Sequence, residues 1–527
     1  MDNFSRTQIV RKAVIPTQGG VVAAQHRRAA EVGARVLEAG GDAVDAAVAT
    51  SFAIGVVEPW MSGIAGGGAM TLWRAAEGKA YTVNYGMRSP GALNPADYPL
   101  ADSGGTSDLF TWAPVQGDKN IQGATAVAVP GVVSGMDLAH RRYGRLPWRE
   151  LLDPAVAMAR EGLQVDWFSA LLTTSAARGL AQDPDAARMF LDDGTWPIVG
   201  AWATLSNRRL DQRVLAGTIE RLAQAGARDF YEGDIARMLA KDIQAKGGCL
   251  TESDLRAYQA EIAESLAIPY RGGVTYAAPG LTAGPTYRQC LEQLTGELAS
   301  GQERPDADAY LAYVRALDAG YRKRLDSSGD GESPGSPACT THFCVVDHHG
   351  NMCAVTQTLL SVFGSRVVSP STGALLNNGI MWFDPVQGRP NSLGPGKRCL
   401  MNVCPVVGRT AGGEHFALGA SGGRKILSAV LQLTSFLMDY GLSLEEAFHC
   451  QRIDMSGGDD VTIDDTLPDE VRQTIARHFP VVLAKRNLFP YAFACPSGVL
   501  RSGGLNMGCT EIMSPWGDAV AERLIQP

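Results

Sequence analysis

The sequence predicts a protein of the mixed α+β class, and three observations support this prediction. Much of residues 20–59 and 130–294 carries apolar side chains at the three- and four-residue steps of helices that bury one face. TTHFCVVDHHGNMCAVTQTL, which begins at Thr340, has the alternating pattern of two strands around a turn at residues 348–351. The length of 527 residues allows two to four folding units, or a single large body.

The N-terminal part is expected to form two successive helices. AAQHRRAAEVGARVLEAGG ends on Gly40 and Gly41, a pair that stops a helix. GDAVDAAVATSFAIGVVEP then predicts a second helix, which is so apolar that we expect it to be buried between layers. Residues 61–70, MSGIAGGGAM, predict a small-residue turn before a strand in TLWRAAEGKAYTVNYG. This turn lacks the Lys and Ser/Thr that hold phosphate, so we interpret it as close backbone packing.

The middle of the chain ends in a marked change of character. Residues 130–294 are expected to be mainly helical, with a helix start at Thr251. Residues 300–338 predict an exposed loop, because they end in DSSGDGESPGSPAC, which is polar and rich in Gly, Pro and Ser. This loop runs directly into the strand that begins at Thr340. Such a junction is what a processing site between Cys339 and Thr340 would look like.

Composition and charge argue against several classes of function. The net charge is −8 and no run of Lys and Arg exceeds three residues, so nucleic acid is not an expected partner. No apolar stretch reaches the roughly 18 residues of a membrane span, and the N-terminus lacks the pattern of a secretion signal. We therefore expect a cytoplasmic protein. The ten Cys are scattered without metal-ligand spacing, so neither a disulfide framework nor a structural metal is expected.

Thr340 is the candidate nucleophile. An N-terminal Thr can attack an amide because its own α-amine, with a pKa of about 7.7 to 8.0, serves as the base. An internal Thr has no such base, so the Cys339–Thr340 bond must first be cut, by attack of the Thr340 hydroxyl on the Cys339 carbonyl. The alternative is that Thr340 is simply the first residue of a strand. The local pattern alone favours that alternative.

A resemblance that spans nearly the whole chain favours the nucleophile. The start of the second half, TTHFCVVDHHGNMCAVTQTL with FGS and LLNN after it, resembles the small subunit of the gamma-glutamyltransferase family, within the N-terminal nucleophile hydrolases. Further blocks resemble the same family in order: GGDAVDAAVA, MSGIAGGGAM, VPGVVSGMDLAHRRYGRLPW, FYEGDIA, GGCLTESDLRAY, YRGG and PGKRCL. The resemblance implies a four-layer αββα sandwich. It also implies self-cleavage into a large segment 1–339 and a small segment 340–527, which form one intertwined folding unit.

The partners and cofactors follow from the same resemblance. The two fragments are expected to associate as a heterodimer, which could pair further into a dimer of heterodimers. The substrate is expected to be a small-molecule amide. Neither a metal nor an organic cofactor is required, because the nucleophile and its base belong to one residue.

The catalytic roles are carried over residue by residue. Thr340 is similar to the family nucleophile, and Thr358 to the second Thr, whose hydroxyl bonds the nucleophile; an ordinary strand threonine is the alternative for Thr358. GASGGRKI is similar to the family's Gly-x-Pro-Gly-Gly loop, with Ser421 in place of Pro. Gly422 and Gly423 would aim backbone N–H groups at the oxyanion, which is worth roughly 3 to 4 kcal/mol, and a glycine helix start is compatible with this role. His342 and Asp347 are interpreted as structural.

The glutamyl pocket of the family is not retained. The replacements are Trp382 for the acid that holds the substrate ammonium, Gly379 for a Gln, Leu360 for an Asn, Met401-Asn402 for paired serines, and Gly86 for the carboxylate-binding Arg. Trp382 and Leu360 offer no carboxylate to an ammonium, so γ-glutamyl donors are poor candidates. Arg88 and Arg366 are candidate clamps for a substrate carboxylate, with structural arginines as the alternative. We expect Trp382 and Asn402 to contact the substrate as well.

The expected substrate is therefore an amide that bears a carboxylate but no ammonium. Two branches of the superfamily fit: one resembles oxamate amidohydrolase of purine and allantoin nitrogen breakdown, the other glutaryl-cephalosporin acylases. Because Trp382 fills the glutamyl site, the sequence favours the small substrate, oxamate, hydrolysed to oxalate and ammonia. The acylase and a gamma-glutamyl hydrolase or transferase are the alternatives.

Overall fold

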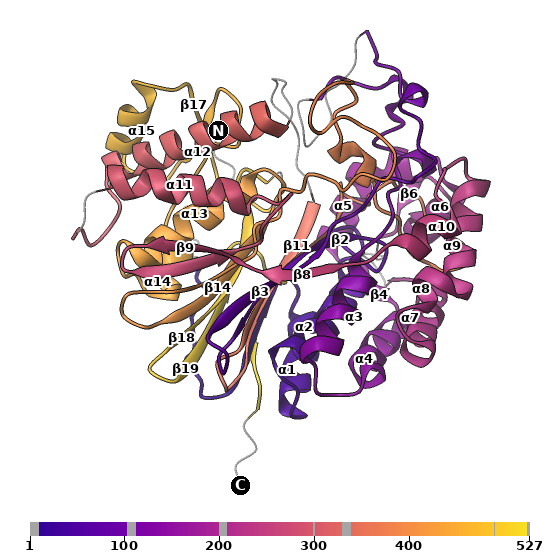
Figure 1. Ribbon diagram of the computed structural model, residues 1–527, viewed down its shortest axis with the longest axis horizontal. Coiled ribbons are helices and arrows are strands. Elements are labelled where there is room, and N and C mark those ends of the chain that lie inside the picture. The colour runs from indigo at the N-terminus through magenta and orange to yellow at the C-terminus, as the bar shows by residue number, and fades with distance from the viewer. Residues whose placement is uncertain are drawn as a thin grey trace.

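Two antiparallel sheets lie face to face between two layers of helices, which gives four layers (Figure 1). The computed structural model describes residues 10–102, 112–199, 208–298, 301–328, 339–489 and 491–523, without the side chains of 325–328 and 339. The expected α+β class and αββα layering are confirmed. No helix among these described residues is long and apolar enough to cross a membrane.

The larger sheet has seven strands and contains the strand that begins beside Thr340. Its order is β20 (Asp518–Ala521), β1 (Val21–Ala24), β11 (Cys339–Val346), β12 (Met352–Leu360), β2 (Gly67–Arg74), β3 (Lys79–Tyr85) and β8 (Glu261–Glu264). The smaller sheet has the order β19 (Leu505–Thr510), β18 (Cys495–Ser502), β14 (His415–Ser421), β13 (Val406–Arg409), β10 (Gly273–Ala277) and β9 (Leu266–Tyr270). Segments before and after Thr340 thus contribute strands to both sheets.

Each sheet is covered by its own helices. The seven-stranded sheet packs against α1 (Arg27–Glu38), α2 (Ala43–Val57) and α3 (Val132–Tyr143). The same apolar cluster includes residues of α4 (Trp148–Glu161), α5 (Trp167–Leu180), α6 (Pro184–Phe190), α7 (Arg213–Ala225), α8 (Asp229–Glu232), α9 (Asp234–Ala245) and α10 (Glu252–Ala257). The six-stranded sheet packs against α11 (Gly284–Glu297), α12 (Ala307–Ser328), α13 (Lys425–Met438), α14 (Leu444–His449) and α15 (Asp469–Ala476). A smaller apolar cluster joins the two sheets.

Short strands complete the described chain outside these layers. They are β4 (Leu163–Gln164) paired with β7 (Arg209–Leu210), β5 (Leu191–Asp192) paired with β6 (Trp196–Pro197), and the three-stranded group β15 (Ile453–Asp454), β16 (Val461–Asp464) and β17 (Val481–Ala484). Four single turns of 3-10 helix are η1 (Pro95–Asp97), η2 (Gln116–Asp118), η3 (Ala124–Ala126) and η4 (Gly379–Trp382).

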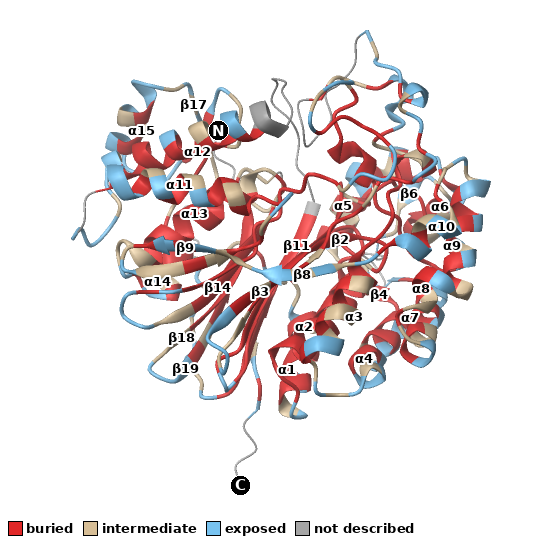
Figure 2. Ribbon diagram, in the orientation of Figure 1, coloured by how far each residue is buried: buried red, intermediate tan, exposed pale blue. Residues whose placement is uncertain are grey.

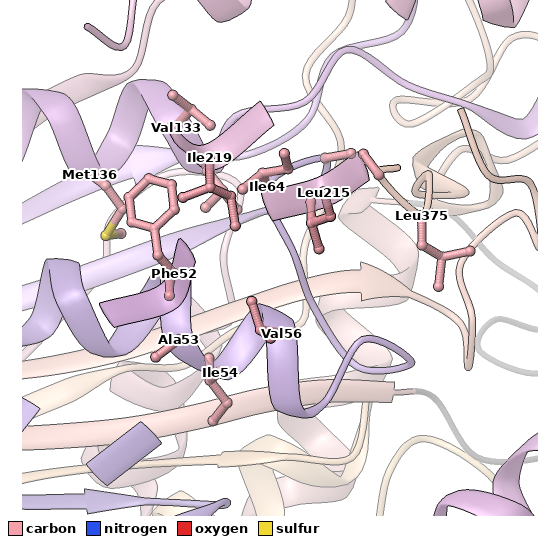
Figure 3. Packing of buried hydrophobic residues seen from close by; sticks show 14 of the residues in the cluster. Phe52, Ala53, Ile54, Val56, Ile64, Val133, Met136, Leu215, Ile219 and Leu375 are labelled. Atoms are coloured by element: carbon pink, nitrogen blue, oxygen red, sulfur yellow. The ribbon is translucent and has the colours of Figure 1, made fainter. Parts of the chain in front are cut away.

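Helix α2 is buried along its whole length, as its apolar sequence predicts. Every residue from Ala43 to Val57 is buried. Figure 3 shows Phe52 and Val56 of this helix packed among apolar side chains from other helices and loops. The helix begins at Asp42, whose side chain accepts the backbone N–H groups of Val44 and Asp45. This buried helix ends at Glu58, directly behind the strand that carries Thr340.

Two sequence-based expectations about secondary structure are wrong, for residues 21–24 and 307–328. Residues 21–24 form strand β1, not helix, because all four side chains are buried and the strand pairs with β11 and β20. Residues 130–294 are mainly helical, as expected, although residues 261–277 within them form β8, β9 and β10. Residues 307–328 form α12, not a loop, because the helix buries side chains such as Tyr313 and Leu317 against the six-stranded sheet's helices. Tertiary packing overrides local propensity in each case.

Other expectations are confirmed. Gly40 ends α1 with a φ of 89°, which a residue with a side chain rarely adopts. Thr251 caps α10 by accepting the backbone N–H of Asp254. The stretch expected to be one strand after the Gly-rich turn is two, β2 and β3, joined at Gly78. The expected loop residues 329–338 lie outside the described residues.

The hairpin of β11 and β12 lies in the middle of the seven-stranded sheet. Its two strands pair antiparallel around the turn at residues 347–351, as the alternating pattern predicts. β11 also pairs with β1, and β12 with β2, so neither strand is an edge. Figure 2 shows this central part of the sheet as buried. A catalytic group at the start of β11 is therefore held by a rigid frame on both sides.

Candidate active site

Thr340 lies at an irregular point of the sheet. Cys339 pairs with Leu360 and Thr341 with Gln357, and the register shifts between these two pairs. Thr340 therefore sits in a local bulge, a feature that re-aims a side chain. Its partner strand ends at Leu360, whose φ of 89° is strained for a residue with a side chain. Both strands therefore depart from regular sheet geometry at the Cys339–Thr340 junction.

The hydroxyls of the two predicted threonines meet. Thr340 Oγ1 lies 3.4 Å from Thr358 Oγ1, across the hairpin. Thr358 Oγ1 also accepts the backbone N–H of Leu360 at 2.8 Å, which fixes its position. Both threonines are buried, with Thr340 5% exposed. The structure thus brings together the residue predicted as nucleophile and the residue predicted to bond it.

Gly422 and Gly423 link the end of β14 to the start of α13. Their φ angles of 127° and 60° lie in the region that favours glycine. A Cβ on Gly422 would also meet Cα of Ala494 at 3.0 Å. Gly423 lines the same cavity as Thr340. The loop therefore places backbone without Cβ atoms at the N-terminus of α13, beside the nucleophile. The positive partial charge at a helix N-terminus favours a developing oxyanion.

A small cavity adjoins Thr340. It has an empty volume of about 200 Å³ and is lined by Thr340, Leu360, Trp382, Asn402, Val403, Gly423 and Ile426. None of these seven described residues has an ionisable side chain at neutral pH. Trp382 is 2% exposed and Asn402 6%, so both side chains are inside the protein.

Two buried hydrogen-bond donors beside this cavity have no partner. Trp382 Nε1 and Asn402 Nδ2 make no hydrogen bond to any described residue. A buried donor left unpaired costs roughly 1 to 3 kcal/mol, so such groups are uncommon in folded proteins. Two of them beside the candidate nucleophile point to a ligand that brings hydrogen-bond acceptors.

The two predicted carboxylate clamps are not part of this cavity. Neither Arg88 nor Arg366 is among the described residues that line it. Arg366 instead donates a hydrogen bond to Gln122, and its side chain packs against Gly179 of α5. Arg88 forms an isolated backbone bridge with Val129. The expectation that these guanidinium groups bind a substrate carboxylate therefore stays a prediction, and the lining of this cavity does not support it.

His342 does not form a relay with Thr340. Burial lowers the pKa of His342 to about 3, so its imidazole is neutral. Its ring nitrogens contact Thr356 Oγ1 at 2.8 Å and Cys344 Sγ at 3.2 Å. Asp347 instead accepts hydrogen bonds from the backbone of Asn351 and of Ala43. Both residues have the structural roles expected from the sequence.

The sequence did not indicate a buried carboxyl group behind the nucleophile. Glu58 is 5% exposed and accepts a hydrogen bond from Thr341 Oγ1 at 2.9 Å. Burial raises the pKa of Glu58 to about 7, although the Thr341 hydrogen bond acts in the opposite direction. The one signal in the sequence is the single acid within the apolar run GVVEP, because acidic side chains are rarely buried.

Comparisons with known proteins identify the class to which this site belongs. The family model of Gamma-glutamyltranspeptidase matches residues 29–339 and 333–488. The chain belongs to this family and is a hydrolase that acts on amide bonds.

Individual relatives agree with this assignment. The chain is 32% identical over 503 residues to an acylase ACY 1 proenzyme of Pseudomonas sp., covering 89% of this chain and 88% of that protein. It is 32% identical over 485 residues to a glutathione hydrolase proenzyme of Pseudomonas aeruginosa, covering 82% of each. Among solved structures, a cephalosporin acylase from Bacillus halodurans has the same fold, with a TM-score of 0.83, 24% identity and 99% of each chain covered.

Proposed function

We propose that this protein is a self-processing amide hydrolase in which Thr340 is the nucleophile. The observation that carries the proposal is that Thr340 shares one cavity with Gly423 and lies 3.4 Å from Thr358 Oγ1. In the reaction, Thr340 Oγ1 bonds to the amide carbonyl carbon and its proton passes to the α-amine of Thr340. The oxyanion is stabilised by backbone N–H groups of the Gly422–Gly423 loop.

The second half of the reaction restores the enzyme. The amide nitrogen leaves with the proton held by the α-amine, which breaks the carbon–nitrogen bond and leaves an ester on Thr340. Water then attacks this ester with the α-amine as base, releasing the carboxylic acid and regenerating the Thr340 hydroxyl.

The α-amine must first be made by cleavage of the precursor. In the described structure, Cys339 and Thr340 are consecutive residues of β11. Attack of Thr340 Oγ1 on the Cys339 carbonyl converts the peptide bond to an ester, and water then hydrolyses this ester. The products are a carboxylate on Cys339 and a free amine on Thr340. The register shift at this point and the φ of 89° at Leu360, which pairs with Cys339, support the proposal, since local backbone strain in the precursor favours such a shift.

An acylase-type substrate is the best-supported choice. The seven residues that line the cavity include no carboxylate to pair with an ammonium, which disfavours a γ-glutamyl group. The unpaired donors of Trp382 and Asn402 suit carbonyl or carboxylate oxygens of an acyl group. An acylase proenzyme is among the relatives at 32% identity. The acylase alternative from the sequence therefore ranks above oxamate.

Oxamate stays a second candidate on one observation. The cavity beside Thr340 is small, which suits a very small amide acid. The relatives named above are acylases and glutathione hydrolases, so they do not favour oxamate. The expectation of a role in purine and allantoin nitrogen breakdown depends on oxamate being the substrate.

A substrate panel tests the proposal. Purified protein is expected to show two fragments on denaturing gels and to hydrolyse a glutaryl anilide faster than a γ-glutamyl anilide. Ammonia release from oxamate is measured in parallel. The Thr340→Ala variant, which should stay as one chain, is the control. Equal rates for the two anilides would overturn the substrate assignment, and hydrolysis by the Thr340→Ala variant would overturn the mechanism.

A further inference from the structure

A buried chain of hydrogen bonds lies on the helix side of β11, behind the nucleophile. Thr341 directly follows Thr340 in β11, and its side chain contacts Glu58 at the end of α2. Its Oγ1 is 2.9 Å from Glu58 Oε2 and 3.4 Å from Gln25 Oε1. All three side chains are buried. They come from three elements: the end of α2, the start of β11 and the loop after β1.

This chain of hydrogen bonds continues to the Gly422–Gly423 loop, called the oxyanion loop from here on. Gln25 Nε2 donates to Ser421 Oγ at 2.6 Å and to the Cys495 carbonyl at 2.8 Å. Ser421 is the last residue of β14 and directly precedes Gly422. Thr341 and Ser421 are therefore one residue away from the nucleophile and from the oxyanion donors, respectively. Gln25 bridges the two, although they belong to different sheets.

The proton of Glu58 decides whether this chain is complete. The Thr341 hydroxyl has one hydrogen to donate. With Glu58 ionised, that hydrogen goes to the carboxylate, and the Gln25 oxygen receives none. With Glu58 protonated, the carboxyl O–H donates to Thr341 Oγ1, and the Thr341 hydrogen turns to Gln25. Because burial raises the pKa of Glu58 to about 7, both forms exist near neutral pH.

Resting on the function proposed above, we propose that Glu58, Thr341 and Gln25 are positioning residues that hold the nucleophile against the oxyanion loop when Glu58 is protonated. None of the three is required to touch the substrate. Their action is to couple the position of β11 to that of the loop after β14. Loss of a proton from Glu58 loosens the coupling at the 3.4 Å contact between Thr341 and Gln25.

The other titratable groups around Glu58 do not compete for this role. The small cavity that it lines also contains Tyr491, Cys495 and Glu511. Burial raises the pKa of the Cys495 thiol, so it stays neutral. Burial opposes ionisation of Glu511, but Arg486 and Arg452 outweigh it and lower the Glu511 pKa to about 2. Glu511 is therefore a fixed, paired charge, and Glu58 is the acid that changes state near neutral pH.

The pH profile of the processed enzyme tests the inference. Once the rise from titration of the Thr340 α-amine is divided out, wild-type kcat should show an alkaline limb, a fall of about fivefold as pH rises through 7, which is the effect of one neutral hydrogen bond. In Glu58→Gln, the amide donates to Thr341 at every pH, so this alkaline limb should disappear while the acid limb from the Thr340 α-amine remains. KM should change little. An alkaline limb retained in Glu58→Gln would overturn the inference.

Substitutions of Thr341 keep the inference testable if Glu58→Gln does not fold. Thr341→Ser keeps the hydroxyl and should keep the alkaline limb. Thr341→Val removes the hydroxyl, so the alkaline limb should disappear. Infrared titration of Glu58 in the inactive Thr340→Ala variant provides a readout that needs no turnover. A carboxylic-acid band that disappears near neutral pH is expected, and a group already ionised at acidic pH would contradict the inference. Absence of turnover in the wild type would instead contradict the proposed function.

Discussion

Thr340 Oγ1 lies 3.4 Å from Thr358 Oγ1, and the backbone N–H of Leu360 holds Thr358 in place at 2.8 Å. These contacts join the start of β11 to the end of β12, two central strands. The distance between the hydroxyls is therefore set by the sheet and not by a loop. A rigid base of this kind limits how far either hydroxyl moves during a reaction. The pair is therefore the natural first target for mutation.

Thr358→Ala should lower kcat without preventing folding. The variant removes the contact in which Thr340 Oγ1 donates to Thr358 Oγ1, and a hydrogen bond to a group that develops charge is worth roughly 1.5 to 3 kcal/mol. Each 1.4 kcal/mol is about tenfold in rate, so we expect a loss of about 10- to 100-fold in kcat. Thr358→Ser, which keeps the hydroxyl, should recover most of it. Steady-state kinetics on the processed enzyme measure both. Equal loss in the two variants would show that the methyl group matters and not the hydroxyl.

Gly422→Ala should damage the oxyanion loop. Its φ of 127° is unfavourable for alanine, and the added Cβ would lie 3.0 Å from Cα of Ala494. If the loop shifts, an oxyanion donor is lost, so kcat should fall by about 10²-fold with KM little changed. Gly412→Ala, in the turn after β13, is a matched control. The added Cβ would lie 3.6 Å from Thr410 Oγ1, an ordinary contact, and Gly412 does not have a positive φ. A KM effect without a kcat effect would contradict the assigned role.

The resemblance places the candidate site residues close together, as the structure has them, whereas parts of the surrounding secondary structure differ from the sequence-based expectation. Thr340, Thr358 and the Gly422–Gly423 loop come together as expected, because each is carried by a motif whose resemblance is read residue by residue. Strand β1 was missed because four consecutive buried residues have no periodicity that separates a strand from a helix. Helix α12 was missed because its polar surroundings hide a stripe of buried aromatic side chains.

Long-range contacts account for what the sequence could not predict at the site. The Glu58–Thr341 hydrogen bond joins residues 283 positions apart, and the Gln25–Ser421 bond joins residues 396 positions apart. No local pattern encodes such pairs. Arg88 and Arg366 illustrate a different limit, because residue type suggests a carboxylate clamp while neither residue lines the cavity beside Thr340. Position relative to a motif does not fix the direction of a long side chain.

Trp382→Phe should weaken substrate binding without destabilising the protein. The change removes the Nε1 donor and keeps an aromatic ring, and no hydrogen bond to a described residue is lost. We expect KM to rise by about 5- to 10-fold, the effect of one lost hydrogen bond, with the melting temperature unchanged or raised. Trp60→Phe is a matched control, since Trp60 Nε1 is also buried and unpaired but belongs to the cluster under the helices. A similar KM in the two variants would refute a binding role for Trp382.

Glu58 should make stability depend on pH in a predictable direction. Its pKa is raised from 4.5 to about 7 in the folded protein, so the folded state binds the proton more tightly than the unfolded state. The stability is fully present below pH 4.5 and is lost as pH rises through 7. A shift of this size corresponds to at most about 3 kcal/mol, at 1.36 kcal/mol per pKa unit. The free energy of unfolding of the wild type, measured relative to Glu58→Gln by denaturant titration, should therefore fall across this window.

Glu77→Gln, at an exposed acid that pairs with Tyr81, provides the control because no buried proton is involved. A wild-type free energy that stays parallel to that of Glu58→Gln would mean that Glu58 is already ionised in the folded protein at acidic pH, and the carboxyl group could not then act as a proton-dependent link behind Thr340.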